Sequence, residues 1–336
     1  IAWSNDTLHH PLFAEWWRRG LALMKPMPLT LAGLGHTPAA GIPRAIRPPG
    51  DGALAGAGAA AAPTTLRVAT AQLVTGVNIS ANVERMKLAI RDAAAQQARI
   101  VIFPEEGVSS YNTTNIAVTP QSVFDAAEVA LAAECAASKI FCLVGIPRFY
   151  NTTNWHNTAV LFDPQGREVY RQAKVYKCCL QDNTPGLWLG TFEVDGIRAS
   201  LQICFDEFHP EVAKLPTLNG TEILFFLHWE SDPQQEYKMQ TYRAMMMGRA
   251  YELGIPLVHS NAGLHISPEG EVTGSHGQSG AFDGYGRVLA ESPIFGEDLQ
   301  VIDVPLSRGL PTGAVSATDG SRSRAHSTAP VFAKWW

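Results

Sequence analysis

The sequence predicts an α/β protein in which helices cover a β-sheet. Apolar runs of strand length recur along the chain, and several are separated by stretches with helical periodicity. Hydrophobic residues make up 46% of the 336 positions, which is enough for a sizeable core. Alternating helices and apolar strands are typical of a sheet that is covered by helices.

Each predicted element has a local reason. Apolar residues from Val83 to Ala94 recur at helical spacing and give one buried stripe. The continuously apolar run from Ile100 to Pro104 is typical of a strand covered on both faces. Pro210 suits the first turn of a helix, where its missing N–H is no loss. The predicted strands are 66–73, 100–104, 140–146, 158–162, 167–175, 199–203, 222–227 and 255–259, and further helices are expected at 123–138, after 210 and at 234–253.

The chain divides into three parts by composition. Residues 1–65 form an N-terminal extension that ends in an Ala/Gly/Pro-rich linker, 66–306 form the body, and 307–336 form a C-terminal tail. The aromatic pairs Trp16-Trp17 and Trp335-Trp336 are costly to leave in water, so we expect both ends to bury against the body or a neighbouring subunit. This predicts a homo-oligomer, either a dimer or a larger assembly that includes filaments, with chance similarity of the two ends as the alternative.

Composition and motifs exclude several classes of function. The formal charge of −5 gives no electrostatic footprint for nucleic acid. No apolar run reaches the length of a membrane-spanning helix. The sequence contains no CxxC pair, HExxH motif or phosphate-binding glycine loop, so we expect neither a metal nor another cofactor.

Cys204 lies at a predicted turn from strand to helix. It follows the apolar run from Ala199 to Ile203 and precedes Pro210. Backbone N–H groups in such a turn, including that of Phe205, have no helical partner and can face a developing negative charge. A lone cysteine is more often a small buried hydrophobe, but two further stretches favour a nucleophile here.

A carboxylate and a lysine also stand at predicted strand ends. Glu105 follows the apolar run that ends in Phe103-Pro104, and Lys174 closes the β-rich run that starts at Glu168. Together with Cys204 these groups fit one reaction. Glu105 takes the thiol proton, Cys204 attacks an electrophilic carbon, and Lys174 stabilises the oxyanion.

These motifs, in this order, resemble those of the nitrilase superfamily of carbon–nitrogen hydrolases. The resemblance rests on Phe103-Pro104-Glu105, on Tyr170-Arg171 leading to Lys174, and on Cys204-Phe205-Asp206 followed by Pro210-Glu211. It continues through 248–261 and 277–289 and covers roughly 66–306. It implies a four-layer α-β-β-α sandwich and a hydrolase that cleaves non-peptide C–N bonds through a thioester on the cysteine.

The resemblance also assigns the two charged groups. It places the catalytic glutamate at Glu105 rather than Glu106. It favours Lys174 over Lys177, although Gln172-Ala173 separates Arg171 from the lysine where the family places them together. Many members carry a further glutamate shortly after the lysine. Here that segment offers only Asp182, which either substitutes for the glutamate or belongs to a surface turn.

Phe205-Asp206 after the cysteine resembles the amidase and carbamoylase members, which implies a small linear amide or N-carbamoyl compound as substrate. Four residues follow strand ends on the same edge as the catalytic groups and are candidates for substrate contact: Tyr111, His228, Trp229 and Glu230. Tyr111 and Trp229 fit core or rim positions equally well.

The compartment is indicated by two features. Five N-x-[ST] sequons are more than chance predicts, and they make glycans possible at Asn5, Asn78, Asn112, Asn151 and Asn219. Apart from Cys204, the four cysteines at 135, 142, 178 and 179 are an even number that can pair in an oxidising environment. These features favour the secretory pathway over the cytoplasm, where free buried thiols are the usual situation in this superfamily.

Two alternatives to a general amidohydrolase stay open. The sequons favour a secreted amidase of the pantetheinase or biotinidase kind. The long extension, the aromatic ends and the interrupted lysine motif favour an assembly protein that uses the same fold with little catalysis.

Overall fold

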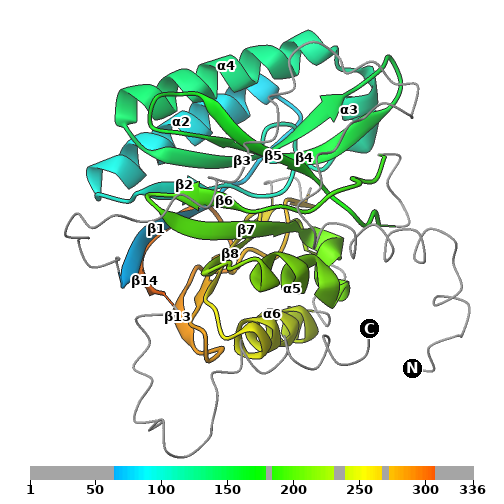
Figure 1. Ribbon diagram of the computed structural model, residues 1–336. Helices are drawn as coiled ribbons and strands as arrows, with labels where there is room; N and C mark the ends of the chain where they lie inside the picture. The colour runs from blue at the N-terminus through cyan, green and yellow to red at the C-terminus, as the bar shows by residue number, and fades with distance from the viewer. Residues whose placement is uncertain (1–63, 179–183, 231–238, 267–271, 307–336) are drawn as a thin grey trace, which may run out of the picture. The chain divides into compact units, whose positions relative to one another are not determined.

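The computed structural model describes residues 64–178, 184–230, 239–266 and 272–306, all of which belong to one compact unit, Gly56–Trp336. The N-terminal extension, most of the linker and the C-terminal tail expected from the sequence lie outside the described residues, and so do both tryptophan pairs. The architecture below is that of the described residues (Figure 1).

Two six-stranded mixed sheets make up the body. In the first, the strand order is β14 (Asp298–Pro305), β1 (Thr65–Gln72), β2 (Ile100–Ile102), β3 (Phe141–Phe149), β4 (Trp155–Phe162) and β5 (Glu168–Ala173). In the second, it is β13 (Val288–Glu291), β12 (Gly280–Phe282), β9 (Leu257–Ser260), β8 (Ile223–Leu227), β7 (Ile197–Ile203) and β6 (Phe192–Val194). A small ribbon pairs β10 (His265–Ile266) with β11 (Val272–Thr273).

The helices cover the outer faces of the sheets. They are α2 (Ile79–Ala95), α3 (Thr113–Val118), α4 (Gln121–Ser138), α5 (Pro210–Leu218) and α6 (Met239–Leu253), with a 3₁₀ turn, η1 (Cys204–Phe208), after β7. In α2 the buried stripe includes Val83, Met86 and Ile90, as its periodicity predicts, and Asn78 caps the first turn by accepting the N–H of Ala81. Helix α5 begins at Pro210, as predicted.

Three apolar clusters fill the spaces between the layers. One lies between the first sheet and α2 and α4, a second lies between the two sheets, and a third lies between the second sheet and α6. Figure 1 shows the same order, with α2 and α4 on one side of the sheets and α5 and α6 on the other. The four-layer α-β-β-α sandwich implied by the sequence is confirmed.

Successive side chains of a strand point to opposite faces of its sheet, and here both faces of the sheet are covered. In β1, Leu66 and Val68 point into the core between the sheets, whereas Ala69 and Ala71 point toward the helices. A strand buried on both sides therefore reads as a continuous apolar run rather than an alternating one. Strand β14, absent from the elements expected above, completes the first sheet by pairing antiparallel with β1.

Parallel pairing determines where the strand ends meet. β1, β2 and β3 run parallel in one sheet, as do β7, β8 and β9 in the other. The carboxyl ends of parallel strands lie at one edge of a sheet, which is where ligands bind in open α/β sheets. Residues that follow β2, β7 and β8 are therefore candidates for a common site.

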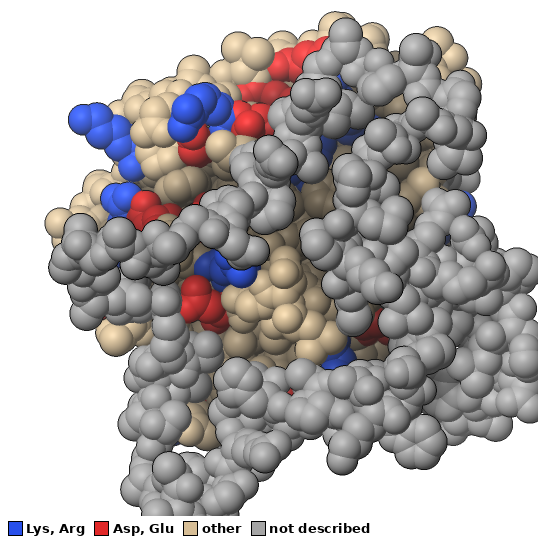
Figure 2. Space-filling view, viewed as in Figure 1, with Lys and Arg blue, Asp and Glu red and all other residues tan. Residues whose placement is uncertain are grey.

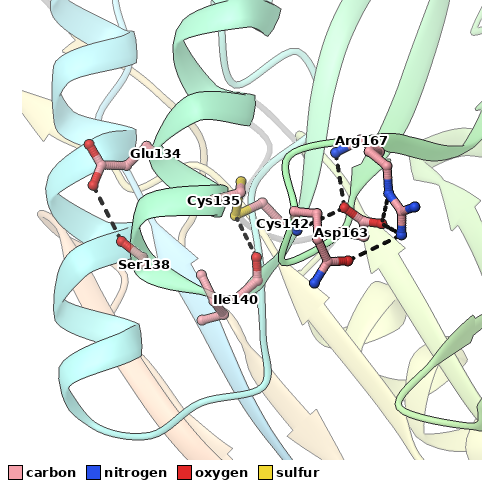
Figure 3. The surroundings of a disulfide bond; sticks show 8 residues. Glu134, Cys135, Ser138, Ile140, Cys142, Asp163 and Arg167 are labelled. Atoms are coloured by element: carbon pink, nitrogen blue, oxygen red, sulfur yellow. Dashed lines mark hydrogen bonds and ion pairs between the residues drawn. A yellow bond between two sulfur atoms is a disulfide. The ribbon is translucent and has the colours of Figure 1, made fainter.

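A disulfide joins α4 to the first sheet. Cys135 on α4 and Cys142 on β3 are bonded across a Cα–Cα distance of 6.3 Å, and both are fully buried (Figure 3). This is one of the pairings that the even cysteine count allowed. Cys179 lies outside the described residues.

Charged side chains of both signs are interspersed on the face shown in Figure 2. Several charged side chains of the described residues form ion pairs: Arg91 contacts Glu134 at 2.6 Å, Arg99 contacts Asp195 at 2.5 Å, and Arg148 contacts Asp125 at 2.6 Å. Within the described residues, no helix is long and apolar enough to cross a membrane.

Gly145 offers a test of the close contact between β3 and the segment after β2. A Cβ at this position would lie 2.3 Å from the carbonyl oxygen of Pro104 and 2.6 Å from the backbone nitrogen of Glu106. We expect Gly145→Ala to displace that segment and to lower the free energy of unfolding by about 1–3 kcal/mol, measured by urea denaturation.

Gly248→Ala is the matched control, because a Cβ there on α6 meets nothing within 4 Å. Alanine favours a helix, so this variant should be as stable as the parent or more stable by about 0.5–1 kcal/mol. Equal stability of Gly145→Ala and the parent would contradict the close packing.

Candidate active site

Three groups that are far apart in the sequence come together where strands of both sheets end. Glu105 follows β2, Lys174 follows β5 directly, and Cys204 begins η1 directly after β7. The Lys174 Nζ donates a hydrogen bond to Glu105 Oε1 at 2.7 Å. Cys204 lies close enough to both groups for their charges to act on its thiol.

The Glu105 carboxylate is fully buried and receives hydrogen bonds on both oxygens. Asn157 Nδ2 donates to Oε1 at 2.6 Å, in addition to Lys174, and the Trp229 backbone N–H donates to Oε2 at 3.0 Å. A buried carboxylate is tolerated only when it is paired and hydrogen-bonded. These donors fix the orientation of Glu105 and leave it suited to accept a proton from a group beside it.

Lys174 is 2% exposed. Burial by itself lowers the pKa of its ammonium group, but the charge of Glu105 and the hydrogen bond to it help to raise the pKa above its ordinary value. Its backbone is held by the neighbouring strand, since the Lys174 N–H donates to the Asn157 carbonyl at 2.8 Å. The side chain is therefore a charged, fixed hydrogen-bond donor beside the thiol.

Cys204 adopts a backbone conformation that is rare for its residue type. Its φ of 43° lies in the left-handed region, where a side chain is strained, and such strain is concentrated at active sites. Burial raises the pKa of the thiol well above its ordinary value, the charge of Glu105 raises it further, and Lys174 opposes both. The resting sulfur is therefore protonated and needs a base before it can attack.

Asp206 connects the lysine segment to the cysteine turn. Its Oδ1 accepts the N–H groups of Val175 at 3.1 Å and Tyr176 at 2.8 Å, and its Oδ2 accepts the N–H of Ile203 at 3.1 Å. Burial raises the pKa of Asp206 to about 7, against the hydrogen bonds that lower it. One side chain thus sets the spacing between Lys174 and Cys204.

Of the two lysines that the sequence left open, Lys174 is the one that contacts Glu105. The Lys177 side chain is exposed. The adjacent carboxylate, Glu106, turns away from this contact: its φ is 50° and its Oε2 accepts the Ser109 hydroxyl at 3.0 Å. Burial raises the pKa of Glu106 well above its ordinary value, and the neighbouring charge of Glu105 adds to this effect.

Of the candidates for substrate contact, Tyr111 and Trp229 lie near Glu105. The ring centroids of Tyr111 and Trp229 lie 6.0 Å apart. Burial raises the pKa of Tyr111, and the charge of Glu105 raises it further, so the hydroxyl group lies close enough to Glu105 to feel its charge. Trp229 also binds Glu105 through its backbone. Asp182 lies outside the described residues.

His228 and Glu230 flank Trp229 and are both buried. The rings of His228 and Phe226 are stacked with their centroids 4.4 Å apart, and His228 Nε2 lies 3.0 Å from His259 Nδ1. The His228 ring is therefore in contact with both neighbours. The Cys204 thiol donates to the Trp229 carbonyl oxygen at 3.9 Å, and the charge of Glu230 helps to raise the pKa of the thiol after burial and Glu105. Glu230 therefore acts on the Cys204 thiol through its charge, whereas His228 packs against Phe226 and His259.

Two residues of the site went unnoticed in the sequence. Asn157, in the middle of β4, binds both Glu105 and the Lys174 backbone. Glu207, three positions after Cys204, is 3% exposed and lies against Glu230. Only the spacing of Glu207 from Cys204 could have indicated it, because a short helical turn brings such positions close. In the part of the chain that the structure describes, no cluster of His, Cys, Asp or Glu could hold a metal ion.

Comparison with known proteins gives the family. The family model for carbon-nitrogen hydrolases matches residues 67–312. The omega-amidase NIT2 of Mus musculus is 26% identical over 50% of this chain and 68% of its own length. The 2-oxoglutaramate amidase of Bacillus subtilis is 23% identical over 63% of this chain and 80% of its own.

The fold has solved counterparts as well. A Nesterenkonia AN1 amidase from the nitrilase superfamily superimposes with a TM-score of 0.66 at 21% identity, covering 82% of this chain and 99% of that one. The chain therefore belongs to the carbon–nitrogen hydrolase family, in the amidase branch of the nitrilase superfamily, and is an enzyme that acts on carbon–nitrogen bonds other than peptide bonds.

Proposed function

We propose that this amidohydrolase cleaves a small linear amide or N-carbamoyl compound through a thioester on Cys204, with Glu105 as general base and acid and Lys174 as oxyanion donor. The observation that carries the proposal is the buried contact of 2.7 Å between Lys174 and Glu105, beside a cysteine with φ of 43°. A base, a cation and a nucleophile at one point are the parts that acyl transfer requires.

The first half of the reaction forms the thioester. Glu105 accepts the thiol proton while the sulfur of Cys204 attacks the amide carbon. The oxyanion that develops is held by the Lys174 ammonium and by the N–H of Phe205, which stands in the first turn of η1, where N–H groups have no partner within the helix. Glu105 then gives its proton to the departing ammonia or amine, and the C–N bond breaks.

The second half releases the acid. Water takes the place of the leaving group, Glu105 removes one of its protons, and the hydroxide attacks the thioester carbon. The C–S bond breaks and Glu105 returns the proton to the sulfur. In a mutant of the Nesterenkonia amidase, the acetamide moiety of fluoroacetamide is added covalently at the active-site cysteine, which supports a nucleophilic cysteine at the corresponding position here.

The charges around the thiol support an uncharged or cationic substrate. The strongest charges acting on Cys204 are those of Glu105, Lys174 and Glu230, which are two acids and one base. The ammonium of Lys174 is already bound to Glu105 and is needed for the oxyanion. A carboxylate carried by the substrate would be repelled by both of these acids.

A secreted amidase of the pantetheinase or biotinidase kind is the second candidate, favoured by the sequons. All four sequon asparagines within the described residues are exposed: Asn78, Asn112, Asn151 and Asn219. Asn78 and Asn112 cap helices through their Oδ1 atoms, which leaves the amide nitrogen for a glycan. Asn5 lies outside the described residues. Together with the Cys135–Cys142 disulfide, these sites support the secretory pathway as the location.

The assembly protein and the expected homo-oligomer depend on the chain ends, which lie outside the described residues. No contact among the described residues favours assembly over catalysis. The assembly role and the homo-oligomer therefore stay predictions.

The catalytic assignment is tested by three substitutions. Cys204→Ala should abolish ammonia release from short amides, because it removes the nucleophile. Lys174→Met should lower kcat by about a hundred- to a thousandfold, the usual effect of losing one oxyanion donor. Lys177→Met, on an exposed side chain, is the matched control and should keep kcat within about twofold. Equal loss in both lysine variants, with unchanged melting points, would contradict the assignment.

The charge preference is tested with amides of matched length. The kcat/KM of butyramide should be at least about tenfold higher than that of succinamate, which carries a carboxylate at its other end. A tenfold ratio corresponds to about 1.4 kcal/mol, the size expected for one unfavourable charge contact. Initial rates at pH 7.5 and at two salt concentrations measure this preference. A higher kcat/KM for succinamate would show that an unrecognised cation lines the site.

The location is tested by glycan analysis. The chain expressed in a eukaryotic secretory pathway should lose mass on treatment with an endoglycosidase that removes N-linked glycans. Asn112→Gln and Asn151→Gln should each remove one increment of that mass. A secreted product of unmodified mass would argue against glycosylation at these sites.

A further inference from the structure

Asn157 binds the catalytic carboxylate, yet the proposed reaction gives it no task. It lies in β4 and is 1% exposed. Its Nδ2 donates a hydrogen bond to Glu105 Oε1 at 2.6 Å. This contact sets the orientation of the amide, because an ionised carboxylate accepts hydrogen bonds and cannot donate one. Within the described residues, Asn157 Oδ1 has no hydrogen-bond partner, so the side chain is held in place through its N–H.

The contact between Asn157 and Glu105 is fixed at both ends by the backbone. Strand β4 lies between β3 and β5, and the Asn157 carbonyl accepts the Lys174 N–H at 2.8 Å. The segment that carries Glu105 lies against β3, where the Val108 N–H donates to the Gly145 carbonyl at 3.3 Å. Strand pairing therefore holds the amide and the carboxylate at the observed separation.

The two oxygens of Glu105 receive different numbers of donors. Oε1 accepts both Asn157 Nδ2 at 2.6 Å and Lys174 Nζ at 2.7 Å. Oε2 accepts the Trp229 N–H at 3.0 Å. A carboxylate offers about four lone-pair sites, which is two on each oxygen. Among the described residues, both lone pairs of Oε1 are therefore occupied, and one lone pair of Oε2 is left to accept a proton.

The thiol and Oε2 are bound to the same residue. Cys204 Sγ donates to the Trp229 carbonyl oxygen at 3.9 Å, and the Trp229 N–H binds Glu105 Oε2. Trp229 follows β8, so one strand end positions both partners of the proton transfer. The oxygen with a free lone pair is thus the one that is linked to the thiol through Trp229.

We propose that Asn157 is a positioning residue that occupies Oε1 of Glu105 and thereby directs the Cys204 proton to Oε2. The inference rests on the proposed function, in which Glu105 is the base. As the thioester forms, the S–H bond breaks, its electron pair forms the C–S bond, and an O–H bond forms at Oε2. The proton then passes from Oε2 to the leaving nitrogen. Lys174 divides its three N–H groups between Glu105 and the oxyanion, whereas the Asn157 N–H holds Oε1 throughout.

The pH dependence of Cys204 alkylation by iodoacetamide tests this role without amide turnover. Asn157→Leu keeps roughly the volume of the side chain and removes the donor. The ionised carboxylate then loses a hydrogen bond and is protonated more readily, so the acid midpoint of the alkylation profile should move to higher pH by about one unit. The acid limb of kcat/KM for butyramide should move in the same direction. Site-resolved mass spectrometry separates Cys204 from the other cysteines.

Thr158→Val is the matched control. Thr158 is the next residue of β4 and is 3% exposed, and its hydroxyl donates to the Ile146 carbonyl at 2.6 Å. The variant also loses a buried hydrogen bond of this strand, but the side chain points to the opposite face of the sheet. Its acid midpoint should equal that of the parent. Asn157→Ser, whose hydroxyl is too short to reach Glu105, should move the midpoint as Asn157→Leu does and replaces that variant if leucine prevents folding.

A double-mutant cycle tests whether Asn157 acts through Glu105. In a Glu105→Gln background there is no carboxylate to protonate, so adding Asn157→Leu should leave the alkylation profile of Cys204 unchanged. A purely structural role would change the profile by the same amount in both backgrounds.

An acid midpoint that stays at the parent value in folded Asn157→Leu or Asn157→Ser would overturn the proposal. So would an equal shift in the Glu105→Gln background or in Thr158→Val. If the midpoint moves as expected while no amide is hydrolysed, the role of Asn157 stands and the proposed hydrolysis fails. If amides are hydrolysed and the midpoint does not move, the hydrolysis stands and the role of Asn157 fails.

Discussion

The buried ion pair between Lys174 and Glu105 is the constraint on which the site depends. Two charges taken out of water destabilise a fold unless their geometry and remaining hydrogen bonds are nearly complete. Here Asn157, Trp229 and Lys174 supply donors to both oxygens of Glu105. The pair therefore depends on three strands, since Asn157 within β4, Lys174 after β5 and Trp229 after β8 must all be in place before both oxygens of Glu105 have donors.

Cys204 is held to this pair by backbone contacts rather than by its own side chain. Asp206 accepts N–H groups from the lysine segment and from the end of β7, so the distance between the ammonium and the sulfur depends on one carboxylate. The strained φ of Cys204 is maintained by the same contacts. The pKa of the thiol is then shifted by its burial and by the charges of Glu105, Lys174 and Glu230.

Much of the fold could be predicted from sequence, because it depends on local patterns. The stripe of α2, the start of α5 at Pro210 and the apolar strands β2 and β8 follow from spacing and residue type. Strand β14 was missed, since its mixed polar and apolar residues become a strand only through pairing with β1. Asn157 was missed for a related reason: within β4 it looks like an ordinary strand residue, and only the register with β5 brings it to Lys174 and Glu105.

The sequence alone determined the family, the layered architecture and the residue types of the candidate site, because strand ends carry Glu105, Lys174 and Cys204 in a recognisable order. Tertiary structure decided which lysine touches the glutamate and which of the two adjacent glutamates is paired with it. The physical reason is that an ion pair depends on distance and burial, and both arise only when segments far apart in the chain pack together.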